Sequence, residues 1–451
     1  MTKDMTQGSP LKLLLAFAVP LMLGSLFQQF YNLADTIIVG RFVGVEALAA
    51  VGSVGGLNYL VLGFVNGIAC GFSIPISWTF GAHDHHEMRR YTANTVWLSI
   101  AFATVLTIVT VAMTHLVLVW TNTPADIIDL ADIYIRTIFA GIPFTLLYNV
   151  TSALMRALGD SKRPLYFLLV ASVLNIGLDL ACIILFNMGV FGAAVATGIS
   201  QLVTCISYFV HFFSKKCTFR LCKFRFDPHL YARILPIGLS DGVTELCTGL
   251  MIFLFNRTVL KCIGTDGVVT YTVIAYVTTI VINLMVGISQ GSQPLVSFQY
   301  GRGDRAACRK LLHYALTTVC IFAPALFLLV FFFAPQIVRT YLSHAGDELI
   351  AYSIGAFRRY SVSYLLLGFN IVIGGFMTAI ERPVPAICIS VGRGLALQSA
   401  VLLLLAAIFG GDAVWYTPIF SEALCLVMSL LFLRSYRRQT DMQLSLIHIS
   451  E

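Results

Sequence analysis

The sequence predicts an all-α integral membrane protein with twelve transmembrane helices in two six-helix lobes. The first observation is composition: 58% of the 451 residues are hydrophobic, only 11% are charged, and the mean hydropathy is +0.85. Soluble domains average about 25% charged residues. The second observation is a series of long apolar runs, and the third is a repeat that relates the two halves of the chain. Together they exclude a soluble fold.

Twelve segments are long and apolar enough to cross a membrane, which takes about 20 apolar residues in a helix. Lipid accepts only helices or closed barrels, because no backbone polar group can stay unpaired there. The runs are too long and too continuously apolar for barrel strands. We expect spans near residues 11–39, 48–76, 92–120, 127–155, 165–187, 191–213, 233–260, 267–298, 311–335, 345–377, 384–409 and 412–434.

The basic residues set the expected orientation. Most lie before the first span, after the last, or in loops that follow even-numbered spans, whereas loops after odd-numbered spans hold only Arg41, Lys261 and Arg339. The positive-inside rule therefore predicts a multi-pass protein with both termini in the cytoplasm. This bias accounts for the net charge of +7, so we expect no nucleic-acid partner.

The two halves of the chain repeat each other. The segment from Gly67, "GIACGFSIPISWTFGAHDHHEMRR", aligns with "GISQGSQPLVSFQYGRGDRAACRK" from Gly287. Seven positions match in this alignment, pairing Gly67, Ile68, Gly71, Ser77, Gly81, Asp84 and Arg89 with Gly287, Ile288, Gly291, Ser297, Gly301, Asp304 and Arg309. A repeat of six helices enters the membrane from the same side each time, so the two copies are parallel. Parallel repeats of this kind are typical of secondary transporters.

The repeat divides the chain into lobes. We expect an N-terminal lobe over residues 1–213, a basic cytoplasmic linker over 214–232 that binds anionic membrane lipid, and a C-terminal lobe over 233–438. Residues 439–451 continue no pattern and receive no interpretation. Pro20 and Pro236 occupy matching points in the first and seventh spans. Proline removes a backbone hydrogen bond, which makes these two positions hinge candidates.

Polar residues inside the first-lobe spans predict an ion site. Asp35 lies in the apolar stretch "FYNLADTIIVG", where a charge costs about 2.5–3.5 kcal/mol, so ionisable residues there are functional by default. Gln28, Tyr31 and Asn32 share its helical face. The fifth span places Asn175 and Asp179 one turn apart, and neighbouring spans offer Asn149 and Thr197. These oxygen donors suit Na⁺, or a proton shared between carboxylates.

The second lobe offers different groups. Asp241 and Glu245 lie one turn apart in the seventh span, and Asn283, Gln290 and Asn370 follow in later spans. Gln28, Asn32, Glu245 and Asn283 are our candidates for a substrate cavity. We expect Arg136, Arg358 and Arg359 to form structural pairs.

No catalytic or metal site is expected. The cluster "HDHH" (83–86) lies in a loop beside Arg89 and Arg90, and the sequence has no Walker A motif, HExxH motif or Ser/His/Asp set. A membrane-embedded enzyme would need a nucleophile and a base at one membrane face, and the buried acids come without a histidine. We therefore predict that the protein is not an enzyme and binds no cofactor beyond a coupling ion.

These residues resemble the multidrug and toxic compound extrusion (MATE) family. The resemblance rests on "LADTIIVG" in the first span, the two G…S…G…D…R segments, "MRALGDSKRP" and "LNIGLDL", in that order. It covers the chain to about Arg438, and the balance of features is similar to the DinF-like branch. The second-lobe glutamate of another branch matches Glu245, but that branch's tenth-helix aspartate has no counterpart in "YLLLGFNIVIGGFM".

The resemblance implies a cation-coupled antiporter of the bacterial inner (plasma) membrane that exports amphipathic, often cationic drugs. It also implies a coupling-ion site, for Na⁺ or H⁺, made of Tyr31, Asp35, Asn149, Asn175, Asp179 and Thr197. We expect alternating access, no obligate protein partner, and a monomer. The alternative is a flippase for lipid-linked oligosaccharides, which has a related architecture but predicts further helices and a more cationic cavity.

Overall fold

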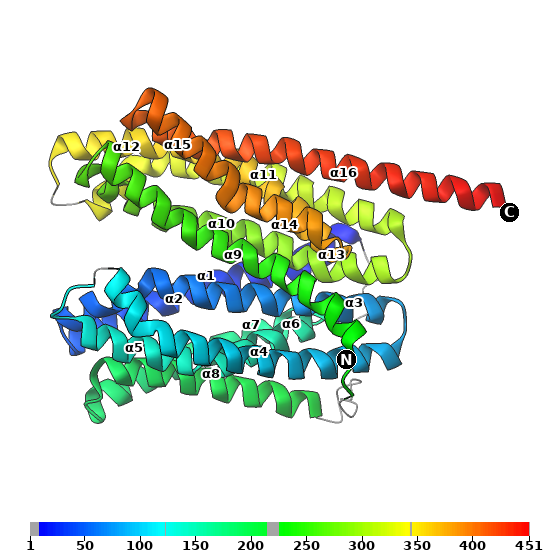
Figure 1. Ribbon diagram of the computed structural model, residues 1–451, viewed down its shortest axis with the longest axis horizontal. Helices are drawn as coiled ribbons and strands as arrows, with labels where there is room; N and C mark the ends of the chain where they lie inside the picture. Colours follow the sequence, from blue (N-terminus) through cyan, green and yellow to red (C-terminus); the bar gives the residue numbers. More distant parts are fainter. Residues whose placement is uncertain (1–8, 122, 214–224, 343–344, 451) are drawn as a thin grey trace.

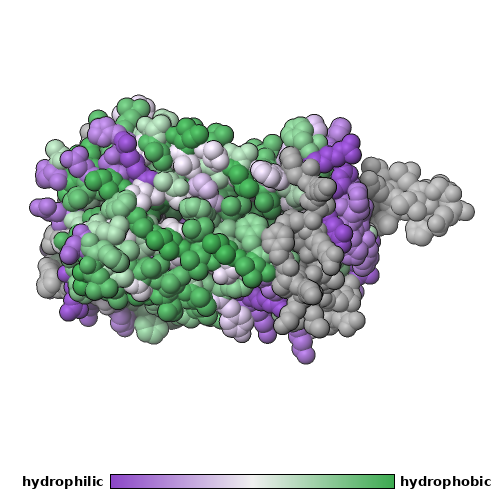
Figure 2. Space-filling model, turned by 90° about the horizontal axis from the view of Figure 1, so that it is seen from below, coloured by the Kyte–Doolittle hydropathy of each residue, from purple (hydrophilic) through white to green (hydrophobic). Residues whose placement is uncertain are grey.

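The computed structural model describes residues 9–121, 123–213, 225–342 and 345–450, with only the backbone course given for 440–450. Within this part of the chain, eleven helices are long and apolar enough to cross a membrane, and one bent helix pair brings the number to twelve. The predicted all-helical membrane fold is confirmed. Figure 2 shows an apolar band between hydrophilic ends, as expected for a protein that lies across a bilayer.

The first lobe contains seven helices longer than ten residues and two shorter segments. Its elements are α1 (Pro10–Phe42), α2 (Val45–Phe72), α3 (Ile74–Gly81), α4 (His85–Trp120), α5 (Ile128–Ala140), α6 (Ile142–Ala157), α7 (Lys162–Leu180), the π-helical η1 (Ala181–Leu185) and α8 (Gly189–Phe213).

The second lobe repeats this order. Its elements are α9 (Pro228–Cys262), α10 (Thr265–Gly301), α11 (Arg305–Tyr341), α12 (Asp347–Ser361), α13 (Tyr364–Ala379), α14 (Pro383–Val391), the π-helical η2 (Gly392–Ala396), α15 (Leu397–Phe409), the 3-10 helix η3 (Gly411–Tyr416) and α16 (Thr417–Ser450). Residues 214–224 of the predicted linker lie outside the described residues. Helix α9 begins at Pro228, four residues before the expected end of the linker at residue 232. Helix α16 runs through most of the uninterpreted tail.

One predicted span is bent. The sequence suggested a single helix over 127–155, but α5 and α6 meet at an angle of 44° at Gly141. Pro143 follows in the first turn of α6, and it removes a backbone donor at this point. By contrast, α1 and α9 continue unbroken through Pro20 and Pro236.

The two lobes lie side by side, and we name the ends of the bundle by the chain termini (Figure 1). The terminal end carries the start of α1, the last turns of α16 and the loops 82–84, 158–161, 302–304 and 380–382. The opposite end carries the loops that follow α1, α4 and α9. The basic loops around 82–84, 158–161, 302–304 and 380–382 lie at the terminal end, and residues 214–224 of the basic linker are outside the described residues.

Each lobe has its own buried apolar core, and each core also includes residues from a helix of the other lobe. Leu14 and Phe17 of α1 belong to the core of the second lobe. Leu230 and Ile234 of α9 belong to the core of the first lobe. The terminal halves of α1 and α9 therefore cross to the partner lobe and join the two.

The repeated glycines lie at this interface. A Cβ atom at Gly67 would lie 2.6 Å from the Asp241 carbonyl oxygen, and one at Gly291 would lie 2.7 Å from Cα of Ala18. A Cβ at either Gly81 or Gly301 would lie 1.9 Å from a backbone oxygen of the other lobe. Small residues let helices approach closely, and here the repeat preserves that property at matched positions.

Two serines complete a reciprocal contact, which we call the serine–glycine clasp: Ser77, Gly81, Ser297 and Gly301. Ser77 Oγ donates to the Pro294 carbonyl oxygen at 2.7 Å, and Ser297 Oγ donates to that of Ile74 at 2.9 Å. Both serines are fully buried. The clasp closes the terminal end of the interface. Toward the opposite end, a Cβ at Gly52, Gly55 or Gly56 of α2 would meet nothing within 4 Å, so this stretch of α2 faces open space.

Charged groups reinforce the closed end. Arg90 of α4 forms an ion pair with Asp227, just before α9, at 2.6 Å. Arg233 of α9 donates from Nε to Glu381 at 3.0 Å and from Nη1 to the Tyr91 hydroxyl at 3.2 Å. Its guanidinium also lies over the Trp78 ring, 4.2 Å from the centroid. One side chain thus holds residues of both lobes.

We expect Arg233→Ala to lower the free energy of unfolding by about 1–3 kcal/mol, because it leaves the carboxylate of Glu381 buried without its charged partner. Burial raises the pKa of Glu381, and Arg233 opposes this shift. The loss should therefore be largest at pH 8, where Glu381 is ionised, and smaller at pH 5, where protonation removes the need for a partner. Thermal unfolding in detergent at both pH values measures it.

The matched control is Arg233→Ala combined with Glu381→Gln, which has no ionised group at position 381. The ion pair therefore contributes no pH dependence, and the difference in unfolding temperature from the wild type due to this pair should be the same at pH 5 and pH 8. An equal loss of stability at pH 5 and pH 8 in Arg233→Ala would contradict the role of Arg233 as the charged partner of ionised Glu381.

Candidate functional site

The central feature of the first lobe is a pair of carboxyl groups between α1 and α7. Asp179 is fully buried, Asp35 is half-buried, and their carboxyl groups lie within hydrogen-bonding reach of each other. The Oδ1 atom of each has no hydrogen-bond partner among the described residues. Two carboxyl groups this close cannot both be ionised unless a cation lies between them, so the pair holds either a proton or a cation. Within the described residues, the sequence-predicted acids do come together.

Neighbouring polar groups support the pair. Asn175, one turn before Asp179, donates from Nδ2 to Asp179 Oδ2 at 2.9 Å in the amide orientation that satisfies both its ends. Its oxygen then accepts from the Thr197 backbone N–H of α8 at 3.2 Å. The Tyr31 hydroxyl interacts with the Thr197 side chain. Helices α1, α7 and α8 thus meet at this site, and α7 is followed directly by the π-helical turn η1, a form often found at functional sites.

Tyr134 also lies at this site, although the sequence did not indicate it. This buried residue of α5 lies near Asp35, Tyr31 and Asp179, and it adds a second phenol to the site. Helical periodicity shows which residues of one helix share a face, but it does not show that a residue of α5 lies beside α1 and α7. The bend at Gly141 sets the direction of α5, and that bend was itself not predicted.

Three predicted residues form no hydrogen bond with the carboxyl pair in the described part of the chain. Asn149 of α6 is half-buried and makes no hydrogen bond to a described residue. Gln28 and Asn32 of α1 are exposed, and neither side chain forms a hydrogen bond to a described residue; the Thr36 hydroxyl donates to the backbone oxygen of Asn32 at 2.8 Å. The structure therefore brings together Tyr31, Asp35, Asn175, Asp179 and Thr197.

The chemistry of this donor set is that of hard oxygen ligands. Carboxylate, amide and hydroxyl oxygens suit Na⁺ or a shared proton rather than a soft metal. In the described ranges, no group of three or more His, Cys, Asp and Glu side chains could hold a metal ion.

The second lobe contains two adjoining cavities. The smaller, of about 560 Å³, is lined by Asp241, Glu245, Gln290 and Gln293 among others. Asp241 accepts from the Thr378 hydroxyl at 3.2 Å, and Glu245 accepts from the hydroxyl of Tyr59, a first-lobe residue, at 3.4 Å. The larger cavity, of about 740 Å³, is lined largely by aromatic and hydroxyl side chains. Asn283 lines neither cavity.

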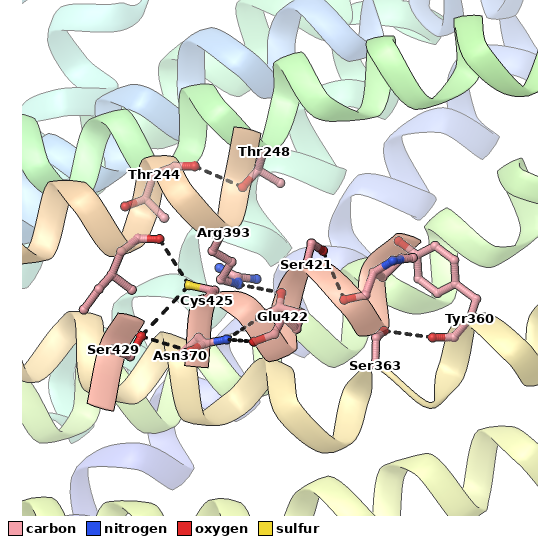
Figure 3. A network of polar contacts seen from close by, with 12 residues as sticks. Thr244, Thr248, Tyr360, Ser363, Asn370, Arg393, Ser421, Glu422, Cys425 and Ser429 are labelled. Carbon is pink, nitrogen blue, oxygen red and sulfur yellow. Dashed lines mark hydrogen bonds and ion pairs between the residues drawn. The ribbon is translucent and has the colours of Figure 1, made fainter. Parts of the chain in front are cut away.

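Arg393, which lines both cavities, and Glu422 belong to a buried polar network, and neither of the two charged residues was expected from the sequence (Figure 3). Arg393 of η2 donates from Nε to Glu422 Oε1 of α16 at 3.0 Å, and both side chains are more than nine-tenths buried. Asn370 Nδ2 donates to Glu422 Oε2 at 2.7 Å, and Ser429 donates to Asn370 Oδ1 at 3.0 Å. The sequence could have indicated them, because Arg393 and Glu422 both interrupt apolar runs. Like Asp35, each is an ionisable residue inside a membrane span, where a charge is costly.

Three further arginines, for which structural pairs were expected, each make a contact with a nearby residue. Arg136 Nε lies 2.7 Å from Asp132, and Arg359 Nη1 lies 3.1 Å from Asp412. Arg358 donates to the Phe331 backbone oxygen at 3.2 Å and lies over the Phe331 ring. The expected pairing with an acid is found for Arg136 and Arg359, whereas Arg358 contacts a backbone oxygen and an aromatic ring instead.

A bundle of two matched lobes, with buried acids at mid-depth and a closed contact at one end, defines the class of secondary membrane transporters. The sequence model of the MatE family matches residues 20–181 and 242–401, one stretch in each lobe. The chain therefore belongs to the MatE family of multidrug and toxic compound extrusion proteins, as the resemblance predicted.

Named relatives agree with this assignment. The chain is 26% identical to the probable multidrug resistance protein YoeA of Bacillus subtilis over 80% of each chain. It is 20% identical to the multidrug export protein MepA of Staphylococcus saprophyticus over 94% of each. A solved structure described as an outward-facing multidrug resistance MATE family transporter of the MOP superfamily has a TM-score of 0.89 at 24% identity, covering 95% of this chain and 96% of that one.

Proposed function

We propose that the protein exports amphipathic, often cationic compounds across the bacterial plasma membrane in exchange for Na⁺ or H⁺. The observation that carries this proposal is the contact between Asp35 and Asp179, which needs a shared proton or a bound cation. A group that must hold a small cation in one state and release it in another is the basis of ion coupling. The names of the multidrug relatives support the substrate class.

The mechanism is alternating access between the lobes. The positive-inside rule assigns the terminal end to the cytoplasm, and the clasp closes that end here. In this state the ion would reach Asp35 and Asp179 from the opposite side. Opening of the clasp, with bending of α1 near Pro20 and of α9 near Pro236, would then expose the site to the cytoplasm.

The energetics are adequate for export. One elementary charge moving down 100 mV releases about 2.3 kcal/mol. Because about 1.4 kcal/mol corresponds to a factor of ten, one ion could maintain roughly a 40-fold gradient of a neutral compound. An ion concentration difference would add to this.

We place the protein in the DinF-like branch and expect it to act as a monomer. The reason for the branch is that the first lobe carries a carboxylate on each of two helices, whereas α13 of the second lobe presents Asn370 at mid-depth and no acid. The flippase alternative is not favoured, because the relatives reported above carry multidrug names.

The test is efflux of a fluorescent cationic dye from vesicles that contain the purified protein. A Na⁺ jump and a pH jump are imposed separately, with the membrane potential clamped. We expect one of the two jumps to drive export and the other to have no effect beyond that of protein-free vesicles. Export that responds to neither jump would overturn the proposal of ion coupling.

A further inference from the structure

We propose that Arg156 is an electrostatic barrier that prevents the coupling cation from leaking to the cytoplasm through the interior of the first lobe. The barrier lies at the end of a row of polar side chains that starts at the carboxyl pair. This inference deepens the proposed function by naming a residue that keeps ion movement coupled to export. It rests on the proposed function only in taking the ion that would leak to be the one held by Asp35 and Asp179.

A row of polar groups, which we call the polar row, runs along the facing sides of α6 and α8. Its members are Thr145, Tyr148, Ser152 and Arg156 of α6, which recur every third or fourth residue on one helical face, and Thr197, Gln201 and Tyr208 of α8. The Thr145 hydroxyl donates to the side-chain oxygen of Gln201. The ring centroids of Tyr148 and Tyr208 lie 5.9 Å apart, and Tyr208 lies close to Ser152. Polar groups thus follow one another from mid-depth to the terminal end.

The polar row begins at the ion site. Thr197 contacts Asn175, the residue that supports Asp179, and it also lines a cavity of about 220 Å³ with Thr145 and Gln201. The last turn of α5 borders this cavity too, and the partial negative charge at a helix C-terminus attracts a cation. Gln201 lies one turn nearer the terminal end than Thr197. A cation that leaves the carboxyl pair therefore finds polar groups on the side that leads to the cytoplasm.

The polar row ends at an arginine without an acid. Arg156 is only 9% exposed and lies one residue before the end of α6. Its Nη1 donates to Ser152 Oγ at 2.8 Å, and its Nη2 donates to Cys70 Sγ at 3.5 Å. None of the ion pairs between described residues includes it. Buried charges are normally paired. An unpaired positive charge across a polar route excludes cations, as an arginine does in other membrane pores.

The position of Arg156 is linked to the interface between the lobes. Its partner Cys70 lies on α2 directly before Gly71, where a Cβ atom would lie 2.6 Å from Cα of Gly238 on α9. The guanidinium is therefore held against a turn of α2 that packs closely on the other lobe. The barrier is in place while the terminal end is closed, which is the state in which the ion enters from the opposite side.

The experiment measures passive ion entry into vesicles that contain the purified protein, with no drug present and the membrane potential clamped. Pyranine inside the vesicles reports H⁺ entry after a pH jump, and radioactive sodium reports Na⁺ entry. We expect Arg156→Gln to raise the entry of at least one of these ions about tenfold, because the repulsion between the guanidinium and the cation is lost. Arg156→Lys keeps the positive charge and should leak much less than Arg156→Gln.

Three further variants separate a barrier from a structural role. Ser152→Asp gives Arg156 an acid partner that cancels its field, so ion entry should rise although the unfolding temperature does not fall. Gln201→Leu added to Arg156→Gln interrupts the polar row, and entry should return close to the wild-type rate. Lys162→Gln removes an exposed charge at the same end of the bundle and should leave entry unchanged. Ser152→Asp also decides the matter if Arg156→Gln does not fold.

Entry at the wild-type rate in Ser152→Asp, or in folded Arg156→Gln, would overturn the proposal. A leak in Arg156→Gln that persists when Gln201→Leu is added would also overturn it, because the ion would then cross elsewhere. Since no drug is present, these outcomes are independent of the export test. Failure of the proposed function would appear instead as wild-type export that responds to neither ion jump.

Discussion

Replacing Asp35 or Asp179 with asparagine should reduce ion-driven dye export by at least about tenfold, close to the level of protein-free vesicles. Each variant keeps the shape of the side chain but removes one of the two charges that a cation must offset. The remaining carboxyl group then no longer needs a partner cation, so uptake and release of the ion are uncoupled from movement of the lobes. Efflux under the effective ion jump measures the loss.

The matched control is Asp126→Asn, since Asp126 is exposed in the loop before α5. It should export dye at the wild-type rate. Asp179→Asn should not lower the unfolding temperature, because it removes a buried acid that lacks a positively charged partner among the described residues. Normal export by both Asp35→Asn and Asp179→Asn would show that the ion site is elsewhere.

Substitution of alanine for Gly81 or Gly301 should prevent the terminal end from closing, and export should fall about tenfold or more. A Cβ at either position would lie 1.9 Å from a backbone oxygen, a distance that no rotamer change relieves. Alanine is otherwise the better helix former by about 1 kcal/mol, so helix propensity does not account for a loss. The expected effect is a shift of the population toward a state in which the clasp is open.

Spin labels at Ala82 and Arg302, one residue beyond each glycine and both exposed, measure this shift directly. Their separation should increase in either alanine variant. Gly55→Ala in α2 is the control, because a Cβ there meets nothing within 4 Å. An unchanged label distance together with normal export would mean that the closed clasp is not a state of the transport cycle.

Much of the fold was predictable because the membrane restricts the possible structures. Long apolar runs can only be helices, and the repeated glycines at 67, 71, 81, 287, 291 and 301 indicated matched lobes before any contact was known. The bend at Gly141 was missed because a Gly-Ile-Pro sequence inside an apolar run is compatible with either a straight or a broken helix. Propensity alone does not choose between them.

The residues of the candidate site that could be predicted are those whose charge is costly inside a membrane span. Asp35 and Asp179 stand out because an unpaired acid in lipid is expensive, and the same reasoning should have identified Arg393 and Glu422. Tyr134 was not predictable in this way, because a tyrosine is unremarkable in a membrane helix. Its role depends on the rotation of α5 about its axis, which packing determines and sequence period does not.

The exchange of core residues between the lobes has a consequence for biosynthesis. Leu14 and Phe17 leave the ribosome among the earliest residues, yet the core in which they are buried is built from α9, α10, α11 and later helices. The start of α1 must therefore wait in lipid or beside the insertion machinery until more than half of the polypeptide has been made. A half produced alone would leave these faces of α1 or α9 against lipid instead of protein, so each lobe completes its packing only when the other is present.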